Sequence, residues 1–279
     1  MKNKIFALLC FCCTFFAYAQ ETENTPADID MQEGSAQISK PRVFKANFKT
    51  GIIIDFKKYS DRRTLNDENI GEYFNDSPHH ISLLIEPHFE YKNFFIEDKT
   101  SLGSEYFTKA VLGYIVHLRY FDFSLGAGIF YDPSTSTTST STAQTSDEEN
   151  NLDDTRSYHQ TIKAPSVNIN FQKDWKNGAT AILKAAYYPY MFIDIMHTLP
   201  AEKYYIKANA MGFNVEAGGI YHFKNTSTGI YAGIDYTYYY AKNAEIAANN
   251  LDNFLWMEGA QAELKSHNIS INLGVSYEF

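Results

Sequence analysis

The sequence predicts an all-β fold: a closed antiparallel transmembrane β-barrel of about ten strands. Three observations lead to this class. Apolar and polar residues alternate with a period of two in long runs, which is the period of a strand and not of a helix. Aromatic residues make up 16% of the chain, although its mean hydropathy is only −0.34. Short and long polar links alternate between the runs, as they do between the two ends of a membrane barrel.

Nine runs carry the alternation clearly, and each is expected to be one strand. They cover residues 43–57, 81–91, 106–119, 121–131, 166–172, 179–187, 211–223, 230–238 and 268–279. A tenth strand requires that the weaker segment Phe94 to Thr100 also crosses the membrane. If that segment is a loop, eight strands is the next expectation, because barrels of this kind have an even strand number.

The amino-terminal residues predict an export signal. Lys2 and Lys4 precede an apolar stretch that is too short to span a bilayer, and Ala17-Tyr18-Ala19 has the small residues of a cleavage site. Residues 1–19 are therefore expected to be a signal peptide, 20–42 a polar periplasmic lead-in and 43–279 the barrel. A lipid-modified cysteine is the alternative, but Leu9, Phe11 and Cys12 precede the three cysteines, at the position where lipid attachment requires a small residue.

Cysteine positions and net charge exclude some functions. The three cysteines (Cys10, Cys12 and Cys13) all lie within the expected signal, so the mature chain has neither a disulfide nor a reactive thiol. The formal net charge is −9, and no stretch is rich in lysine and arginine. A nucleic-acid partner is therefore not expected.

The links between runs predict the topology. Long polar links are expected at residues 58–78, 133–157, 193–203 and 242–261, and short ones near 92–93, 119–120, 173–178 and 224–227. Outer-membrane barrels have short turns in the periplasm and longer loops outside. The link at 133–157 is mostly serine and threonine with a few acidic residues, so it is expected to be a disordered outer loop.

The last run carries the most specific signal. Its apolar face ends on an aromatic residue at the carboxyl terminus and consists of Ile269, Ile271, Leu273, Val275, Tyr277 and Phe279. This run resembles the terminal strand of outer-membrane β-barrel proteins, which the barrel-assembly machinery recognises. The resemblance implies an assembly signal at Ile271, Leu273, Val275, Tyr277 and Phe279, a place in the outer membrane of a Gram-negative bacterium, and lipid as a partner.

A secreted, soluble β-sandwich with an amphipathic last strand is the competing interpretation. In a sandwich the apolar faces would be buried in a core, and aromatic residues would have no reason to gather at both ends of the strands. Here they do gather there, for example at Tyr91 and Phe121 on one side and at Phe56 and Tyr131 on the other. Two aromatic girdles at the membrane interfaces explain this distribution.

The polar faces of the runs predict the interior. By parity, charged residues of both signs point inward, and a barrel this narrow can be filled by its own side chains. We therefore expect a network of ion pairs in the lumen. Its members are Lys49, Asp55, Glu86, His88, Lys109, Arg119, Asp122, Lys184, Glu216 and Asp235. A narrow polar conduit is the alternative, whereas a wide pore needs 16 or more strands.

Two enzyme families deserve comparison, and outer-membrane proteases are the first. They resemble this chain in size and use acidic residues and a histidine at the outer rim. Asp153, Asp154 and His159 lie in an expected outer loop, but the paired motifs of that family on facing strands are not found. A solvated acidic loop is the simpler interpretation.

Outer-membrane lipid A deacylases are the second family. His80-Ile81-Ser82 looks like their His-x-Ser motif, and Glu86 and Glu90 follow, but the spacing departs from that family. His79 and His80 are poor metal co-ligands, because neighbouring residues of a strand point to opposite faces. The sequence thus predicts no catalytic residue, metal or cofactor.

Three functions remain for the barrel. The first is a non-enzymatic surface or structural protein with a lumen filled by side chains. The second is a narrow channel or transporter for a small solute. The third is a hydrolase acting at the outer rim. Apart from lipid and the assembly machinery, the sequence identifies no partner.

Overall fold

A computed structural model gives the fold of residues 44–66, 68–76, 80–103, 106–133, 135–139, 155–198, 203–250 and 253–279. The expected signal peptide and lead-in (residues 1–42) lie outside this described part. No helix among the described residues is long and apolar enough to cross a membrane. Twelve β-strands account for the described structure.

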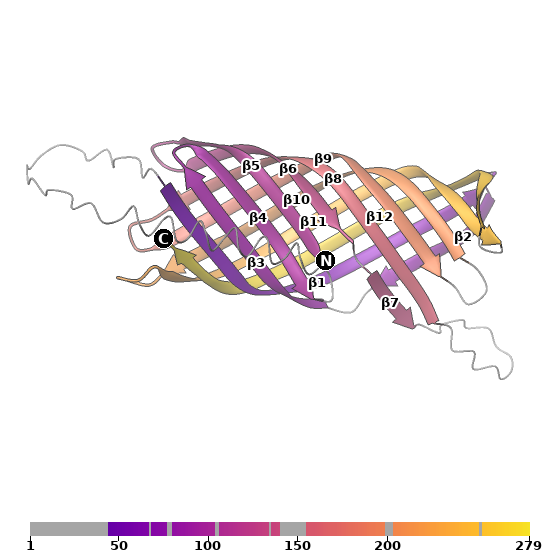
Figure 1. Cartoon of the computed structure of the whole chain (residues 1–279), viewed down its shortest axis with the longest axis horizontal. Coiled ribbons are helices and arrows are strands. Elements are labelled where there is room, and N and C mark those ends of the chain that lie inside the picture. The colour runs from indigo at the N-terminus through magenta and orange to yellow at the C-terminus, as the bar shows by residue number, and fades with distance from the viewer. Residues whose placement is uncertain are drawn as a thin grey trace, which may run out of the picture. The chain divides into compact units, whose positions relative to one another are not determined.

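Ten of the twelve strands form an antiparallel ring (Figure 1). The ring strands are β1 (Phe44–Leu65), β3 (His80–Tyr91), β4 (Phe94–Gly103), β5 (Phe107–His117), β6 (Asp122–Asp132), β8 (Thr155–Asp174), β9 (Ala179–Thr198), β10 (Lys203–His222), β11 (Thr228–Asn250) and β12 (Asn253–Glu278). The prediction of a closed antiparallel barrel of about ten strands is thus confirmed, and the weak segment from Phe94 is its strand β4.

The ring closes between its first and last strands. β1 pairs with β12 from Asn47↔Glu278 to Leu65↔Ala260, and the indigo β1 lies beside the yellow β12 in Figure 1. The backbone N–H of Phe279 donates to the carbonyl oxygen of Ala46 at 2.9 Å and extends this pairing to the last residue. Closure satisfies the edges that an open sheet would leave unpaired.

The remaining two strands lie beside the ring strands near one end. β2 (Glu68–Asp76) pairs with the second half of β1, on the edge that β3 uses in the first half. β7 (Thr135–Ser139) pairs with the first residues of β8, whose later residues pair with β6. The end that carries β2 and β7 is called the loop end below. The opposite end holds Phe44, Phe279 and the short turns at residues 92–93, 118–121, 175–178 and 223–227, and is called the terminal end.

The two ends of the barrel have opposite hydrophobic patterns, as β12 illustrates. Towards the terminal end its outward residues are apolar and exposed, such as Leu273 (44%), whereas its inward residues are polar, such as Asn272 (0%). Towards the loop end the inward residues are apolar, such as Leu264 (0%), whereas Lys265 faces outward. An apolar belt therefore surrounds the terminal half, and the loop half has the polar surface and apolar interior of a water-soluble domain.

This inversion corrects three of the predicted long links. Residues 58–78, 193–203 and 242–261 were expected to be polar links, but strands run through most of each: β1 and β2, β9 and β10, and β11 and β12 respectively. The prediction was wrong because it required the apolar face to stay outward. Beyond the apolar belt the outer surface faces water, so an outward lysine or glutamate there is compatible with a strand.

Irregularities in the strands also interrupted the period-two alternation of apolar and polar residues in the sequence. On β9 the buried residues are even-numbered up to Tyr188 and odd-numbered from Met191, with Pro189 between them. On β11 the parity changes between Ala241 and Ala244, where Asn243 has a φ of 60°. Each bulge exchanges the two faces of its strand, so a strict period of two ends at the bulge although the strand continues.

The serine- and threonine-rich link at 133–157 is shorter than expected. β7 and the first residues of β8 pair from Thr135↔His159 to Ser139↔Thr155, so both ends of this link are strand. Residues 140–154, including Asp153 and Asp154, lie outside the described residues.

Candidate functional site: the lumen

A layer of charged side chains crosses the lumen of the terminal half. It consists of the lysines Lys49, Lys99 and Lys184 and the carboxylates Glu86, Glu97, Glu216 and Asp235. These seven residues, called the charged layer below, come from β1, β3, β4, β9, β10 and β11. Ionic contacts therefore join strands that are far apart in the sequence.

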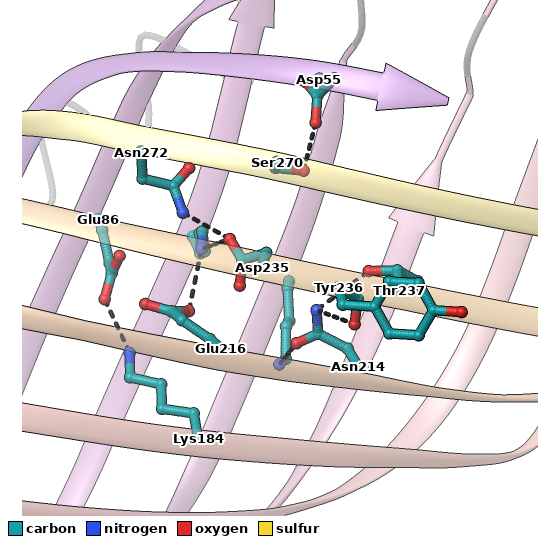
Figure 2. A network of polar contacts seen from close by, with 12 residues as sticks. Asp55, Glu86, Lys184, Asn214, Glu216, Asp235, Tyr236, Thr237, Ser270 and Asn272 are labelled. Atoms are coloured by element: carbon teal, nitrogen blue, oxygen red, sulfur yellow. Dashed lines mark hydrogen bonds and ion pairs between the residues drawn. The ribbon is translucent and has the colours of Figure 1, made fainter. Parts of the chain in front are cut away.

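Two sets of ion pairs make up the charged layer. In the first, Lys184 Nζ lies 2.8 Å from Glu86 Oε1 and 2.7 Å from Glu97 Oε1, and Lys49 Nζ lies 2.7 Å from the same Glu86 oxygen. In the second, Lys99 Nζ lies 3.0 Å from Glu216 Oε2 and 2.7 Å from Asp235 Oδ2. Lys99 thus bridges Glu216 and Asp235, which extend from neighbouring strands in Figure 2.

Neutral side chains complete the coordination of the carboxylates. The Tyr231 hydroxyl donates to Glu216 Oε1 at 2.7 Å, and Asn272 Nδ2 donates to Asp235 Oδ2 at 2.5 Å. The ammonium of Lys49 also lies 4.8 Å from the centre of the Tyr231 ring. Glu86 and Glu216 are only 0% and 2% exposed, so each charge depends on these partners in place of water.

His88 extends the layer toward the terminal end. Its Nε2 lies 2.9 Å from Glu90 Oε1, and its Nδ1 lies 3.1 Å from Glu97 Oε2. Both nitrogens can donate to carboxylates only when the imidazole carries two protons. The ring stacks on Phe95 with a centroid distance of 5.6 Å. Phe95 fits against Gly113, because a Cβ at that position would overlap the Phe95 ring.

Cavities lie on both sides of the charged layer. The terminal vestibule has a volume of about 270 Å³, is lined by Lys45, Trp175 and His222 among others, and reaches Lys49 and Lys184. The inner chamber has about 60 Å³ and lies beyond Lys99 and Asp235. A third cavity of about 20 Å³ shares Lys184 with the vestibule and Lys109 with the chamber. That volume holds about one water molecule.

The loop half is filled by an apolar cluster, called the loop-end core below. Its members come from β1 and β8 to β12: Tyr59, Ile162, Ala164, Ala186, Tyr188, Met191, Ile193, Ile195, Ile206, Ala208, Ala210, Tyr239, Ala241, Ala244, Ile246, Ala260, Ala262 and Leu264. Many are alanines, whose small side chains let the contributing strands pack closely. Met191, Ile195 and Ile206 are each 0% exposed.

The structure brings together most of the residues predicted for the lumen. Lys49, Glu86, Lys184, Glu216 and Asp235 belong to the charged layer, and His88 contacts it through Glu97.

The other predicted lumen residues lie apart from the layer. Asp55 accepts from Ser270 at 2.5 Å (Figure 2), and Lys109 donates to Asn214 at 3.4 Å. Asp122 pairs with exposed His117 at the terminal end. Arg119 lies outside the lumen network, because it sits in the exposed turn after β5 and lies over the ring of Tyr120.

Two central members of the layer were not predicted. Lys99 and Glu97 lie on β4, whose sequence FFIEDKTSLG lacks the regular apolar alternation that would have fixed its faces. A signal was nevertheless present. Phe95, Glu97 and Lys99 are spaced by two residues, so they share one face of any strand that contains them.

Two of the residues considered for catalysis are enclosed. Ser82 is 3% exposed, and Glu86 is held by two lysines. His159 is exposed on β8, while His79 lies outside the described residues. The described residues hold no group of three or more histidine, cysteine, aspartate or glutamate side chains that could bind a metal ion.

One histidine–carboxylate pair in the loop half was not anticipated. His197 Nε2 lies 3.0 Å from Asp61 Oδ2, and Arg63 Nε lies 2.9 Å from the other carboxylate oxygen. The Tyr59 hydroxyl also donates to Asp61, at 3.2 Å. The side chains of Asp61 and His197 are 0% and 4% exposed, and neither residue lines the vestibule or the inner chamber. A substrate has no path to this pair through those cavities.

The predicted assembly signal forms one row on the outer face of β12. Ile271, Leu273, Val275, Tyr277 and Phe279 are between 37% and 55% exposed. The polar residues between them, such as Asn272 and Ser276, are 0% exposed and face the lumen.

Comparisons with known proteins agree with this architecture. No protein-family model and no curated protein matches the chain. Among solved structures, it is similar to the outer-membrane protease OmpT of Escherichia coli, with a TM-score of 0.62 and 11% identity over 86% of this chain and 98% of that one. The chain folds as an outer-membrane β-barrel. At this identity the likeness concerns the fold alone.

Two further outer-membrane barrels match with much lower scores. Neisserial surface protein A has a TM-score of 0.23 and 8% identity, over 80% of this chain and 97% of that one. The Pseudomonas putida toluene transporter TodX has a TM-score of 0.28 and 6% identity, over 84% and 90%.

Proposed function

We propose that this outer-membrane barrel is a non-enzymatic surface protein that does not conduct solutes. The observation that carries the proposal is that two different layers of buried side chains lie in succession along the lumen. A solute entering from the vestibule would have to separate Lys184 from Glu86 and Lys99 from Asp235, all of them buried. It would then have to cross the loop-end core, where Met191 and Leu264 are 0% exposed.

The dimensions of the gaps support a closed lumen. The cavity of about 20 Å³, which shares Lys184 with the vestibule and Lys109 with the chamber, accommodates about one water molecule and no larger solute. Opening the layer would expose buried charges whose desolvation is compensated only by their ion pairs. The lumen is thus better suited to bracing the wall than to transport.

The orientation follows from the connections. In outer-membrane barrels the short turns and both termini lie in the periplasm and the longer connections lie outside. The terminal end then faces the periplasm, and the loop half projects beyond the apolar belt at the cell surface. In this orientation the row from Ile271 to Phe279 is the signal for the assembly machinery, and the belt contacts lipid.

The buried polar groups argue against a hydrolase. A catalytic group must reach its substrate, but Ser82, Asp61 and His197 are enclosed. The protease OmpT shares the fold, and at 11% identity that similarity does not extend to an activity. We therefore assign Asp61 and His197 a structural role within the loop half.

Conductance in planar bilayers tests the proposal. The purified barrel, inserted with its folded state verified by heat-modifiable gel mobility, should give no discrete current steps. A matched preparation of Lys265→Met, which changes only the exposed outer face, should behave identically. Regular steps from the unmodified protein would show a conducting lumen and would favour the channel. Cleavage of lipid A or of a peptide library by the protein, but not by Ser82→Ala or His197→Ala variants, would favour the hydrolase.

A further inference from the structure

We propose that the outer edge of β2 accepts an extended, basic segment of a partner protein as an additional strand. This inference deepens the proposed function, since it rests on the loop half being displayed at the cell surface and names a partner class for it. Strand addition uses backbone hydrogen bonds for affinity and side-chain pairs for selectivity.

The first observation is the unpaired edge. β2 has nine residues and pairs with β1 from Lys58↔Asp76 to Leu65↔Glu68. Within the described part of the chain, no strand pairs with its other edge. An unpaired edge presents a row of backbone N–H and C=O groups that another strand can use. β7 also lies at the side of the ring, but it has only five residues.

The second observation is that acidic residues are the only charges on the β2 edge. Natural edges carry charged residues, proline or a bulge that prevents unwanted pairing. The sequence ENIGEYFND has neither proline nor lysine, and its charged residues, Glu68, Glu72 and Asp76, are all acidic. The register irregularity lies between Arg63 and Thr64, near the β1–β2 turn, and the pairing from Gly71 to Asp76 is regular. The regular part is long enough for an added strand.

The third observation concerns charge. Glu72 is opposite Arg62, Asp76 is opposite Lys58, and Phe74 lies between them opposite Ser60. The acidic positions of β2 thus have basic residues as cross-strand neighbours on the paired side. An added strand on the open side meets the same positions, and opposite charges across strands stabilise the pair.

The spacing of Glu72 and Asp76 defines the partner. The partner should have two basic residues four positions apart in an extended segment, with an apolar or β-branched residue midway. A second copy of this chain fits poorly, because full-length antiparallel self-pairing of β2 would set Glu72 opposite its own copy and Glu68 opposite Asp76. Like charges directly opposite destabilise a strand pair.

A designed peptide tests the proposal on the full mature chain in lipid nanodiscs. The probe is the labelled peptide Thr-Lys-Thr-Val-Thr-Lys-Thr, and its binding is measured by fluorescence anisotropy. Two controls replace both lysines by glutamate or methylate the backbone nitrogens. We expect each control to bind at least roughly tenfold more weakly than the lysine peptide. The glutamate peptide loses the charge pairs, and the methylated peptide loses the backbone hydrogen bonds. Hydrogen exchange of the β2 amides should slow only with the lysine peptide.

A charge-swapped variant provides the decisive control. Glu72→Lys and Asp76→Lys reverse the charge of the β2 edge. Arg62→Glu and Lys58→Glu keep the charges of the β1–β2 pairs complementary. This fourfold variant should prefer the glutamate peptide. Equal binding of the methylated peptide, or an unchanged preference for lysine in the variant, would overturn the proposal. Conductance of the same preparation tests the lumen independently, and binding in nanodiscs but not on intact cells would contradict only the proposed orientation.

Discussion

Lys99 Nζ and Asp235 Oδ2 lie 2.7 Å apart, although 136 positions separate these residues in the sequence. Their strands, β4 and β11, are not neighbours in the ring, so the ion pair spans the lumen. The contact joins two walls that backbone hydrogen bonds do not connect directly. Glu216 shares the same amine, so Lys99 bridges two buried carboxylates.

Removing this cation should destabilise the barrel. In Lys99→Met, Glu216 and Asp235 retain Tyr231 and Asn272 but lose their common positive partner. Loss of one member of a buried ion pair costs about 3–5 kcal/mol. Urea unfolding in lipid vesicles, followed by tryptophan fluorescence, measures the change.

Two variants control this experiment. Lys265→Met on the exposed outer face should leave the unfolding midpoint unchanged. Adding Glu216→Gln and Asp235→Asn to Lys99→Met should recover much of the loss, because the buried charges are then gone. If Lys99→Met is as stable as the wild type, the charged layer does not brace the wall.

The inversion of faces along β12 predicts four different cysteine environments. The cysteines of this chain lie at positions 10, 12 and 13, so after removal of a signal peptide a single introduced cysteine is a clean reporter. Val275→Cys should be quenched by lipid-attached nitroxide, and Lys265→Cys should react with a water-soluble maleimide. Asn272→Cys and Ala262→Cys should respond to neither reagent in the folded protein.

Each departure from this pattern has a distinct meaning. Quenching of Lys265→Cys by lipid would extend the membrane to the loop half. Rapid labelling of Ala262→Cys would mean that the loop-end core is open to water.

A charge in the middle of the apolar belt should impair assembly. Leu273→Arg places a cation among lipid tails, at a cost of about 2–4 kcal/mol. Deletion of Phe279 removes both the terminal aromatic residue and its hydrogen bond to Ala46. Both variants should accumulate in the periplasm, as measured by surface protease protection and gel mobility. Gln261→Arg, on the outer face of the loop half, is the matched control and should assemble normally.

The last part of β12 was predictable from sequence because its parity is constant there. From Ser266 to Phe279 even-numbered residues face the lumen and odd-numbered residues face outward, so the alternation of hydrophobicity identifies both faces. The far half of β9 was not predictable in this way. Pro189 interrupts the parity, and beyond it Ile193 and Ile195 face inward in a region where the apolar side is no longer the outer one.

The ion pairs themselves lie beyond sequence reasoning. Parity places Lys184 and Glu86 in the lumen, but their distance of 2.8 Å depends on the number of strands and on the stagger between them. The charges were therefore predicted as a set, and their partners come from the closed ring.

The serine- and threonine-rich segment between β7 and β8 should be dispensable for folding. Ser139 is paired directly with Thr155, so a two-residue turn can join the two strands in place of residues 140–154. Asn-Gly suits such a turn because both residues tolerate positive φ. Shortening a loop changes its closure entropy by only about 0.6 kcal/mol for each halving of length, and the shorter loop is the more favourable one. The replacement should yield a heat-modifiable barrel at wild-type levels.

In the unmodified protein, protease added to intact cells should cut between Asp147 and Asp154, because the proposed orientation places this segment outside. Cleavage that needs permeabilised cells would reverse that orientation, and failure of the Asn-Gly variant to assemble would show that residues 140–154 contribute to the fold.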